Sequence, residues 1–221
     1  AYICKEAIEE ARRKTFDCDG DGFSFSNSYW SDPIFLGKYP DDLVEKYGDK
    51  IPKFTDEEWA LVTTPLDFYG CNIYYARVSE NRGEYTDIYK QGTATTDIGW
   101  PVTPEVLYWS SRFFYERYGK PIFITENGLA SHDWVCVDGK VHDSYRIDYT
   151  TRYLRELKKA NDEGYKVAGY MHWSLMDNFE WSHGYTKRFG LVYVNYETQE
   201  RIIKDSGYWY KSVIESNGEN L

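Results

Sequence analysis

The chain has 221 residues, a formal net charge of −10 and an aromatic content of 19%. This length predicts a single domain over residues 1–221, and the balance of 28% charged and 42% hydrophobic residues is typical of a globular protein. The acidic excess argues against nucleic acid and against an anionic membrane surface as partners, and no apolar run is long enough to span a bilayer.

The cysteines give no sign of a metal site or a disulfide framework. They are widely spaced and form no C-x-x-C pair, which zinc sites commonly use. We therefore expect no metal and no other cofactor, and a reduced, cytoplasmic location. The four positions are Cys4, Cys18, Cys71 and Cys136.

The first quarter of the chain predicts one helix followed by irregular structure. Apolar residues at helical spacing predict a helix over residues 6–14. Residues 17–22 match the start of a calcium-binding loop, but Ser28 stands where such a loop needs a glutamate. We therefore expect a polar turn there, and a long loop that continues to about Lys53.

Three strands alternate with three helices in the rest of the chain, which predicts an α/β fold with parallel strands and right-handed crossovers. The strand over residues 121–125 is apolar throughout and is predicted to be buried on both faces. A closed eight-stranded barrel typically needs about 250 residues, more than this chain has. The strands are expected over residues 68–76, 121–125 and 167–174, with a further short strand over 190–195. The helices are expected over residues 104–118, 144–163 and 204–216, and a polar loop over 77–101.

A carboxylate follows the second strand directly. Glu126 ends the apolar run, and Asn127 and Gly128 turn the chain immediately after it. In parallel α/β folds, functional groups gather at the carboxyl ends of the strands. A carboxylate at such a place can equally cap a helix or pair with an arginine, so position alone leaves both interpretations open.

Polar and aromatic residues mark the ends of the other two strands. Asn72 and Tyr74 occupy alternate positions of the first strand, so their side chains are expected on the same side, and a tyrosine there can donate a hydrogen bond to a carboxylate. The third strand leads into Trp173, Glu180 and Trp181. Two indoles and a carboxylate suit a sugar, which stacks on aromatic faces and donates hydroxyl hydrogen bonds.

Several longer segments carry a family resemblance. They include DFYGCNIYYA, KPIFITENGLA, YRIDYTTRYL, GYMHWSLMDNFEWSHGYTKRFGLVYVNY and KDSGYWY. From about Trp30 onward the chain resembles the C-terminal part of the family 1 glycoside hydrolases, the β-glucosidase family. The resemblance implies a TIM (β/α)8 barrel, of which this chain holds about strands six to eight, and the hydrolysis of β-glycosides with retention of configuration.

The resemblance also implies a role for each candidate site residue. Glu126 would be the catalytic nucleophile, and Tyr74 would donate a hydrogen bond to it. Trp173 would form the floor of the first sugar subsite, and Trp100 would border the aglycone. The residues implied in substrate binding are Asn72, Trp100, Trp173, Glu180, Trp181 and Phe189.

One motif of that family is missing. The acid/base glutamate of these enzymes lies in an Asn-Glu-Pro motif on the fourth strand, and this sequence has no such motif. A complementary N-terminal chain of the same barrel is therefore the expected partner, with a β-glycoside as substrate. The alternative is a sugar-binding half-barrel or an isolated fragment without turnover. Glu126 favours hydrolysis, because a binding module needs no carboxylate beneath the anomeric carbon.

Overall fold

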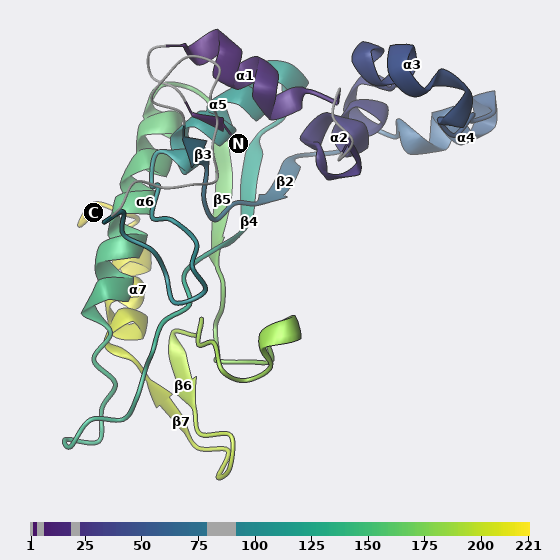
Figure 1. Ribbon diagram of the computed structural model, residues 1–221. Helices are drawn as coiled ribbons and strands as arrows, with labels where there is room; N and C mark the ends of the chain where they lie inside the picture. The colour runs from purple at the N-terminus through teal and green to yellow at the C-terminus, as the bar shows by residue number, and fades with distance from the viewer. Residues whose placement is uncertain (1, 4–6, 19–22, 79–91) are drawn as a thin grey trace.

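A three-stranded parallel sheet in the order β2-β4-β5 lies at the centre of the computed structural model, which describes residues 2–3, 7–18, 23–78 and 92–221. One helix follows each strand, and all three helices lie on the same side of the sheet (Figure 1). The predicted alternation and the parallel sheet are therefore confirmed. The strands are β2 (Tyr69–Asn72), β4 (Ile122–Asn127) and β5 (Val167–His172). The helices are α5 (Val106–Tyr118), α6 (Ser144–Asp162) and α7 (Asp205–Glu215).

The remaining elements surround this unit. The N-terminal part contains β1 (Tyr2–Ile3), α1 (Ile8–Phe16), η1 (Phe23–Phe25), α2 (Asn27–Leu36), α3 (Asp41–Tyr47), η2 (Gly48–Lys50) and α4 (Asp56–Val62). The strand β3 (Arg77–Val78) pairs with β1. After β5 come η3 (Trp181–His183), β6 (Val192–Val194) and β7 (Arg201–Ile203).

The long loop predicted up to Lys53 is wrong, because this region forms α2 and α3, with α4 just beyond it. Local capping explains these helices. The Ser26 hydroxyl accepts a hydrogen bond from the Tyr29 amide at the start of α2, and Gly37 ends the helix at a φ of 71°. Thr55 and Glu58 form a capping box at the start of α4. Helices α2 to α4 extend beyond β2, away from α6 and α7 (Figure 1).

The calcium-like turn falls partly outside the described residues, since 19–22 are not among them. Within the ranges that the structure describes, no three or more His, Cys, Asp or Glu side chains cluster as metal ligands would. None of the helices in these ranges combines the length and the apolar character needed to cross a membrane.

The last predicted strand exists but pairs differently from the other three. It is β6, which forms an antiparallel hairpin with β7, a strand that the sequence analysis did not predict. The hairpin lies beyond the carboxyl ends of β4 and β5, beside the loops that follow them (Figure 1).

The two faces of the sheet differ in burial. Ile122 and Ile124 are fully buried and belong to the hydrophobic core beneath the helices. Phe123 and Thr125, which alternate with them, are only half-buried. The expectation that this strand is buried on both faces is therefore wrong. The physical reason is that the helices cover one face only, and the other face remains partly open.

Candidate active site

Glu126 and Tyr74 are in direct contact at the carboxyl end of β4. The phenolic Oη of Tyr74 donates a hydrogen bond to Oε2 of Glu126 at 2.7 Å. Burial, this hydrogen bond and the charges of Glu126 and Glu180 raise the pKa of Tyr74 far above its usual value. The phenol therefore keeps its proton at neutral pH, and it remains a donor to the carboxylate.

The pairing of β2 with β4 brings Tyr74 to this position. Asn72 lies opposite Glu126 after a register shift, and the amide of Ile73 donates to the Glu126 carbonyl at 2.9 Å. Strand β2 ends at Asn72, so the predicted strand over 68–76 is too long and Tyr74 lies beyond it. The side chain of Asn72 contacts a neighbour of the carboxylate, since Thr125 Oγ1 donates to Asn72 Oδ1 at 2.6 Å.

Two aromatic rings, those of Trp100 and Phe189, lie beside Tyr74, the partner of Glu126. The ring centroid of Tyr74 is 4.9 Å from that of Trp100 and 6.4 Å from that of Phe189. The rings of Trp100 and Phe189 are 6.2 Å apart. Phe189 is buried, whereas Trp100 is half-buried. We call these three residues the aromatic cluster; they come from three different loops at the same end of the sheet.

The loops after β4 and β5 are in contact at Trp173. Its amide donates to the Asn127 carbonyl at 2.8 Å, and the next amide, of Ser174, donates to the Phe189 carbonyl at 3.1 Å. A side chain at Gly128 would place its Cβ 1.9 Å from the Trp173 carbonyl oxygen. Glycine is therefore required there, because only its backbone permits so close an approach.

Glu180 and Trp181 lie further along the loop after β5. The Glu180 amide donates to the Gly184 carbonyl at 2.7 Å and so closes the turn of η3. The charge of Glu180 also contributes to the raised pKa of Tyr74, after burial and the hydrogen bond and charge of Glu126. Trp181 is 80% exposed, so the structure does not bring its ring into the aromatic cluster.

A buried ionic network behind the site was missed by the sequence analysis. Arg146 of α6 and Lys204 at the start of α7 are completely buried, and both contact Asp133. Lys204 Nζ also donates to Asp177 Oδ1 at 2.9 Å. Three carboxylates and three cations balance the charge of the network, whose members are Asp133, Asp143, Arg146, Asp177, Arg188 and Lys204.

This network fixes the loops that carry the site residues. Asp133 belongs to the loop after Glu126, and Asp177 belongs to the loop between Trp173 and Glu180. Burial alone would raise the pKa of Asp133, but the charges of Arg146 and Lys204 outweigh it and hold the pKa below its usual value. The Asp133 carboxylate therefore stays ionised, and the ion pairs of Asp133 and Asp177 attach the two loops to the helices.

A sequence signal for one member of the network existed. Arg146 shares the buried stripe of α6 with Tyr149 and Tyr153, at a spacing of three and seven residues. An arginine on the apolar face of a helix needs a buried partner. No comparable pattern marks Lys204, because it precedes its helix.

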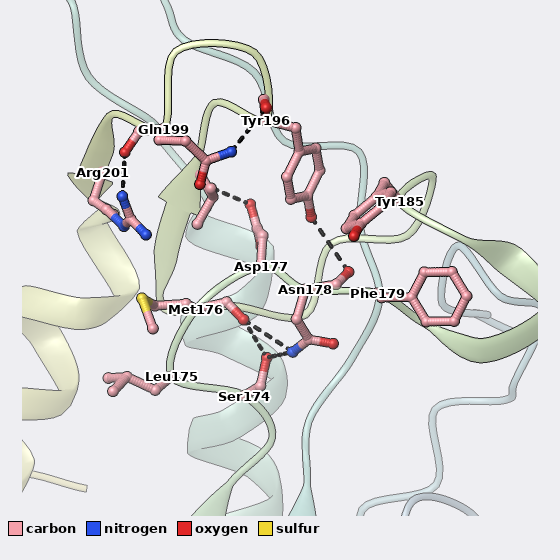
Figure 2. A pocket seen from close by; sticks show the side chains of 11 residues that line it. Ser174, Leu175, Met176, Asp177, Asn178, Phe179, Tyr185, Tyr196, Gln199 and Arg201 are labelled. Carbon is pink, nitrogen blue, oxygen red and sulfur yellow. Dashed lines mark hydrogen bonds between the residues drawn. The ribbon is translucent and has the colours of Figure 1, made fainter.

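A cavity of about 560 Å³ opens between the loop after β5 and the β6–β7 hairpin (Figure 2). The rings of Tyr185 and Tyr196 lie 4.6 Å apart at one side of it. At its base the Asn178 amide donates to Ser174 Oγ at 3.0 Å and to the Met176 carbonyl at 3.1 Å. None of the predicted site residues lines this cavity.

Comparison with known proteins gives consistent relatives. The chain is 41% identical to a 1,4-beta-D-glucan glucohydrolase of Thermotoga neapolitana and 40% identical to beta-glucosidase A of Thermotoga maritima, in both cases over 84% of this chain and 43% of the relative. Its structure is similar to that of the Thermotoga maritima β-glucosidase in complex with deoxynojirimycin, with a TM-score of 0.81 and 36% identity.

These relatives are about twice as long as this chain. The structural match covers 98% of this chain but only 48% of the Thermotoga maritima enzyme. The structural neighbours of this chain are TIM-barrel β-glucosidases, so the three-stranded sheet corresponds to part of a barrel. The model of the family described as glycosyl hydrolase family 1 matches residues 4–219, and the chain belongs to this family.

Proposed function

We propose that this chain is the nucleophile-bearing part of a retaining β-glycosidase that acts on β-D-glucosides and related β-glycosides. One observation carries the proposal: a carboxylate at the end of a parallel strand accepts a 2.7 Å hydrogen bond from a half-buried tyrosine. The names of the relatives, β-glucosidase and glucan glucohydrolase, support the substrate class.

The proposed reaction has two steps. Glu126 attacks the anomeric carbon, the glycosidic bond breaks, and the leaving oxygen takes a proton from a carboxylic acid on the opposite side. The glycosyl ester of Glu126 is then hydrolysed by water, which the same acid group, now a base, deprotonates. Tyr74 binds Oε2 and so orients the carboxylate, which leaves Oε1 for attack on the sugar.

The surrounding residues bind the substrate in this proposal. Glu180 accepts hydrogen bonds from sugar hydroxyls, and Trp173 and Trp181 offer aromatic faces to the ring. Asn72 binds a hydroxyl near the nucleophile. Trp100, the outer ring of the aromatic cluster, borders the leaving group.

The Asn-Glu-Pro motif that carries the acid/base glutamate of the family is absent from this sequence, so another polypeptide segment would have to supply that residue. We propose that this chain holds strands six to eight of one catalytic barrel, and that a separate N-terminal part supplies the other strands and the acid/base glutamate. In the described residues β2 and β5 are the outer strands of the sheet, so each has one unpaired edge. Exposed apolar side chains lie along β5 and the loop after it. Among them are Met171, Leu175 and Phe179, which are 55, 66 and 56% exposed. Closing the barrel would pair both edges and cover these side chains.

The test is covalent labelling of an assembled enzyme. We define the assembled enzyme as this chain co-expressed with the part of Thermotoga maritima beta-glucosidase A that lies outside the match. A chimera that joins both parts in one polypeptide controls for failure to associate. A 2-deoxy-2-fluoro-β-glucoside with a good leaving group should form a slowly hydrolysed ester, and peptide mapping should locate it on Glu126.

The outcomes distinguish the two hypotheses, a catalytic part of a glycosidase and a sugar-binding half-barrel without turnover. Turnover of an aryl β-glucoside by the assembled enzyme, with none by this chain alone, supports the proposal. Sugar binding without labelling or turnover in the chimera supports the non-catalytic half-barrel instead. Labelling of another carboxylate, or full activity of Glu126→Gln, contradicts the assigned nucleophile.

A further inference from the structure

Asp97 joins three loops at the carboxyl end of the sheet. Lys187 Nζ donates to Asp97 Oδ2 and to the Asp97 carbonyl oxygen, each at 2.9 Å. The other carboxylate oxygen pairs with His132 Nε2. The Asp97 amide donates to the Ala130 carbonyl at 3.1 Å. The loop before α5, the loop after β4 and the loop after β5 thus meet at one residue.

This ion pair is shielded from solvent. The side chain of Asp97 is 10% exposed and that of Lys187 is 19% exposed. Exposed ion pairs contribute little because water screens them, but a largely buried pair is screened much less. Removing the ammonium group of Lys187 would leave the largely buried Asp97 carboxylate with His132 as its side-chain partner. The loop that carries Asp97 would then move to expose the carboxylate to water.

Two members of the aromatic cluster lie immediately beside the pair in the chain. Trp100 follows Asp97 by three residues, in a turn closed by the Thr96 amide, which donates to the Trp100 carbonyl at 2.8 Å. Phe189 follows Lys187 by two residues, and its ring is 6.2 Å from that of Trp100. The pair therefore fixes the separation of the two loops from which these rings project.

We propose that Asp97 and Lys187 are positioning residues that hold Trp100 against the leaving-group side of the site, and so set the preference for aromatic leaving groups. The inference rests on the proposed function, because that function assigns Trp100 to the leaving group. The sugar side of the site does not depend on the Asp97–Lys187 pair. Glu180 lies three residues after Asp177, and the Asp177 carboxylate is held by Lys204. Loss of the pair should therefore weaken contacts to the leaving group and spare those to the sugar.

The experiment measures binding, so it does not depend on turnover. Calorimetry on the assembled enzyme compares two glucosides that are not hydrolysed, phenyl 1-thio-β-glucoside and methyl 1-thio-β-glucoside, with deoxynojirimycin as a probe of the sugar side alone. In Lys187→Met the phenyl compound should bind about three- to tenfold more weakly, the size expected for one misplaced aromatic contact. Binding of the methyl compound and of deoxynojirimycin should change less than about twofold.

Two further variants make the result specific. Lys187→Arg keeps the cation and should restore most of the affinity for the phenyl compound. Lys140→Met removes an exposed lysine from the loop after β4 and should change none of the three affinities. An equal loss for all three ligands in Lys187→Met, or no loss for any, overturns the inference. Failure of the proposed function is a different result, namely ligand binding without labelling of Glu126.

Discussion

The carbonyl oxygen of Trp173 occupies the space in which a side chain at position 128 would have to lie. An ideal Cβ on Gly128 would stand 1.9 Å from that oxygen. The contact joins the loop after the proposed nucleophile to the loop that binds the sugar in our proposal. The spacing of Glu126 and Trp173 therefore depends on the absence of one methyl group.

Gly128→Ala should separate these two loops. Because the neighbouring atom is backbone, relief of the overlap requires a shift of the chain, and we expect a loss of about 1–3 kcal/mol in unfolding free energy. Gly48→Ala is the matched control, since nothing lies within 4 Å of its Cβ position. Urea unfolding of both variants is the measurement, and equal stability of the two would contradict the argument.

Tyr74→Phe should impair catalysis in the assembled enzyme without unfolding it. The variant loses the 2.7 Å hydrogen bond to Glu126, and a bond to a charged group contributes about 1.5–3 kcal/mol. We expect kcat/KM for an aryl glucoside to fall about 10- to 150-fold. Tyr75→Phe is the control, because the Tyr75 side chain contacts Trp100 through its ring. A similar loss of kcat/KM in both variants would show that altered packing, and not the hydrogen bond to Glu126, causes the effect.

Lys204→Met should destabilise the chain far more than an exposed lysine does. It leaves Asp177 and Asp133 without one buried cation, and breaking a buried pair costs about 3–5 kcal/mol. Lys211→Met, in the helix α7 that follows Lys204, removes an exposed pair with Glu215 and should cost about 0.5 kcal/mol or less. Urea midpoints and slopes of both variants test this difference. A loss below about 1 kcal/mol for Lys204→Met would mean that the network does not fix the loops.

His172 should make stability depend on pH in mildly acidic solution. Burial, with the charge of Arg146 nearby, lowers the pKa of His172 to about 3, whereas an unfolded histidine titrates near pH 6.5. Between these values the unfolded chain binds a proton that the folded chain does not. This contribution to stability is complete above about pH 6.5 and falls by about 1.4 kcal/mol per pH unit below it.

The measurement is the unfolding free energy from pH 4 to 6. His172→Gln should show a slope smaller by about one proton than that of the unchanged chain. His142→Gln is the control. Hydrogen bonds to Asp205 and Asp138 raise the pKa of His142, so its titration lies above this window. An unchanged slope in His172→Gln would show that this histidine does not titrate as its burial implies.

The periodic part of the fold was predictable from the sequence. Apolar strands alternating with capped helices gave the parallel sheet, and a carboxylate directly before Asn-Gly gave the position of Glu126. The N-terminal helix α1 was predicted, but α2, α3 and α4 were missed, because Gly and Pro in this region are typical of loops. Pro33 in fact lies inside α2, and the capping box of Thr55 and Glu58 was present in the sequence.

The contacts between distant segments were not predictable. The Lys187–Asp97 pair joins residues 90 positions apart, and the Lys204–Asp133 pair joins residues 71 apart. Neither has a periodic signal, because each residue lies in or beside a loop. The site contact of Tyr74 with Glu126 spans 52 positions, and its prediction rested on family resemblance and not on spacing.

The two outer strands of the central sheet, β2 and β5, also determine how copies of this chain would meet if the proposed N-terminal part were absent. In the residues that the structure describes, the outer edges belong to β2 on one side of this sheet and to β5 on the other, and its three strands run parallel. The β5 edge of one copy can therefore add to the β2 edge of the next in a head-to-tail manner. Such heterologous pairing has no twofold axis to close it, so it propagates into rings or open filaments and not into a discrete dimer. The N-terminal part that we propose would thus also prevent this polymerisation, because it would occupy both edges of the same molecule.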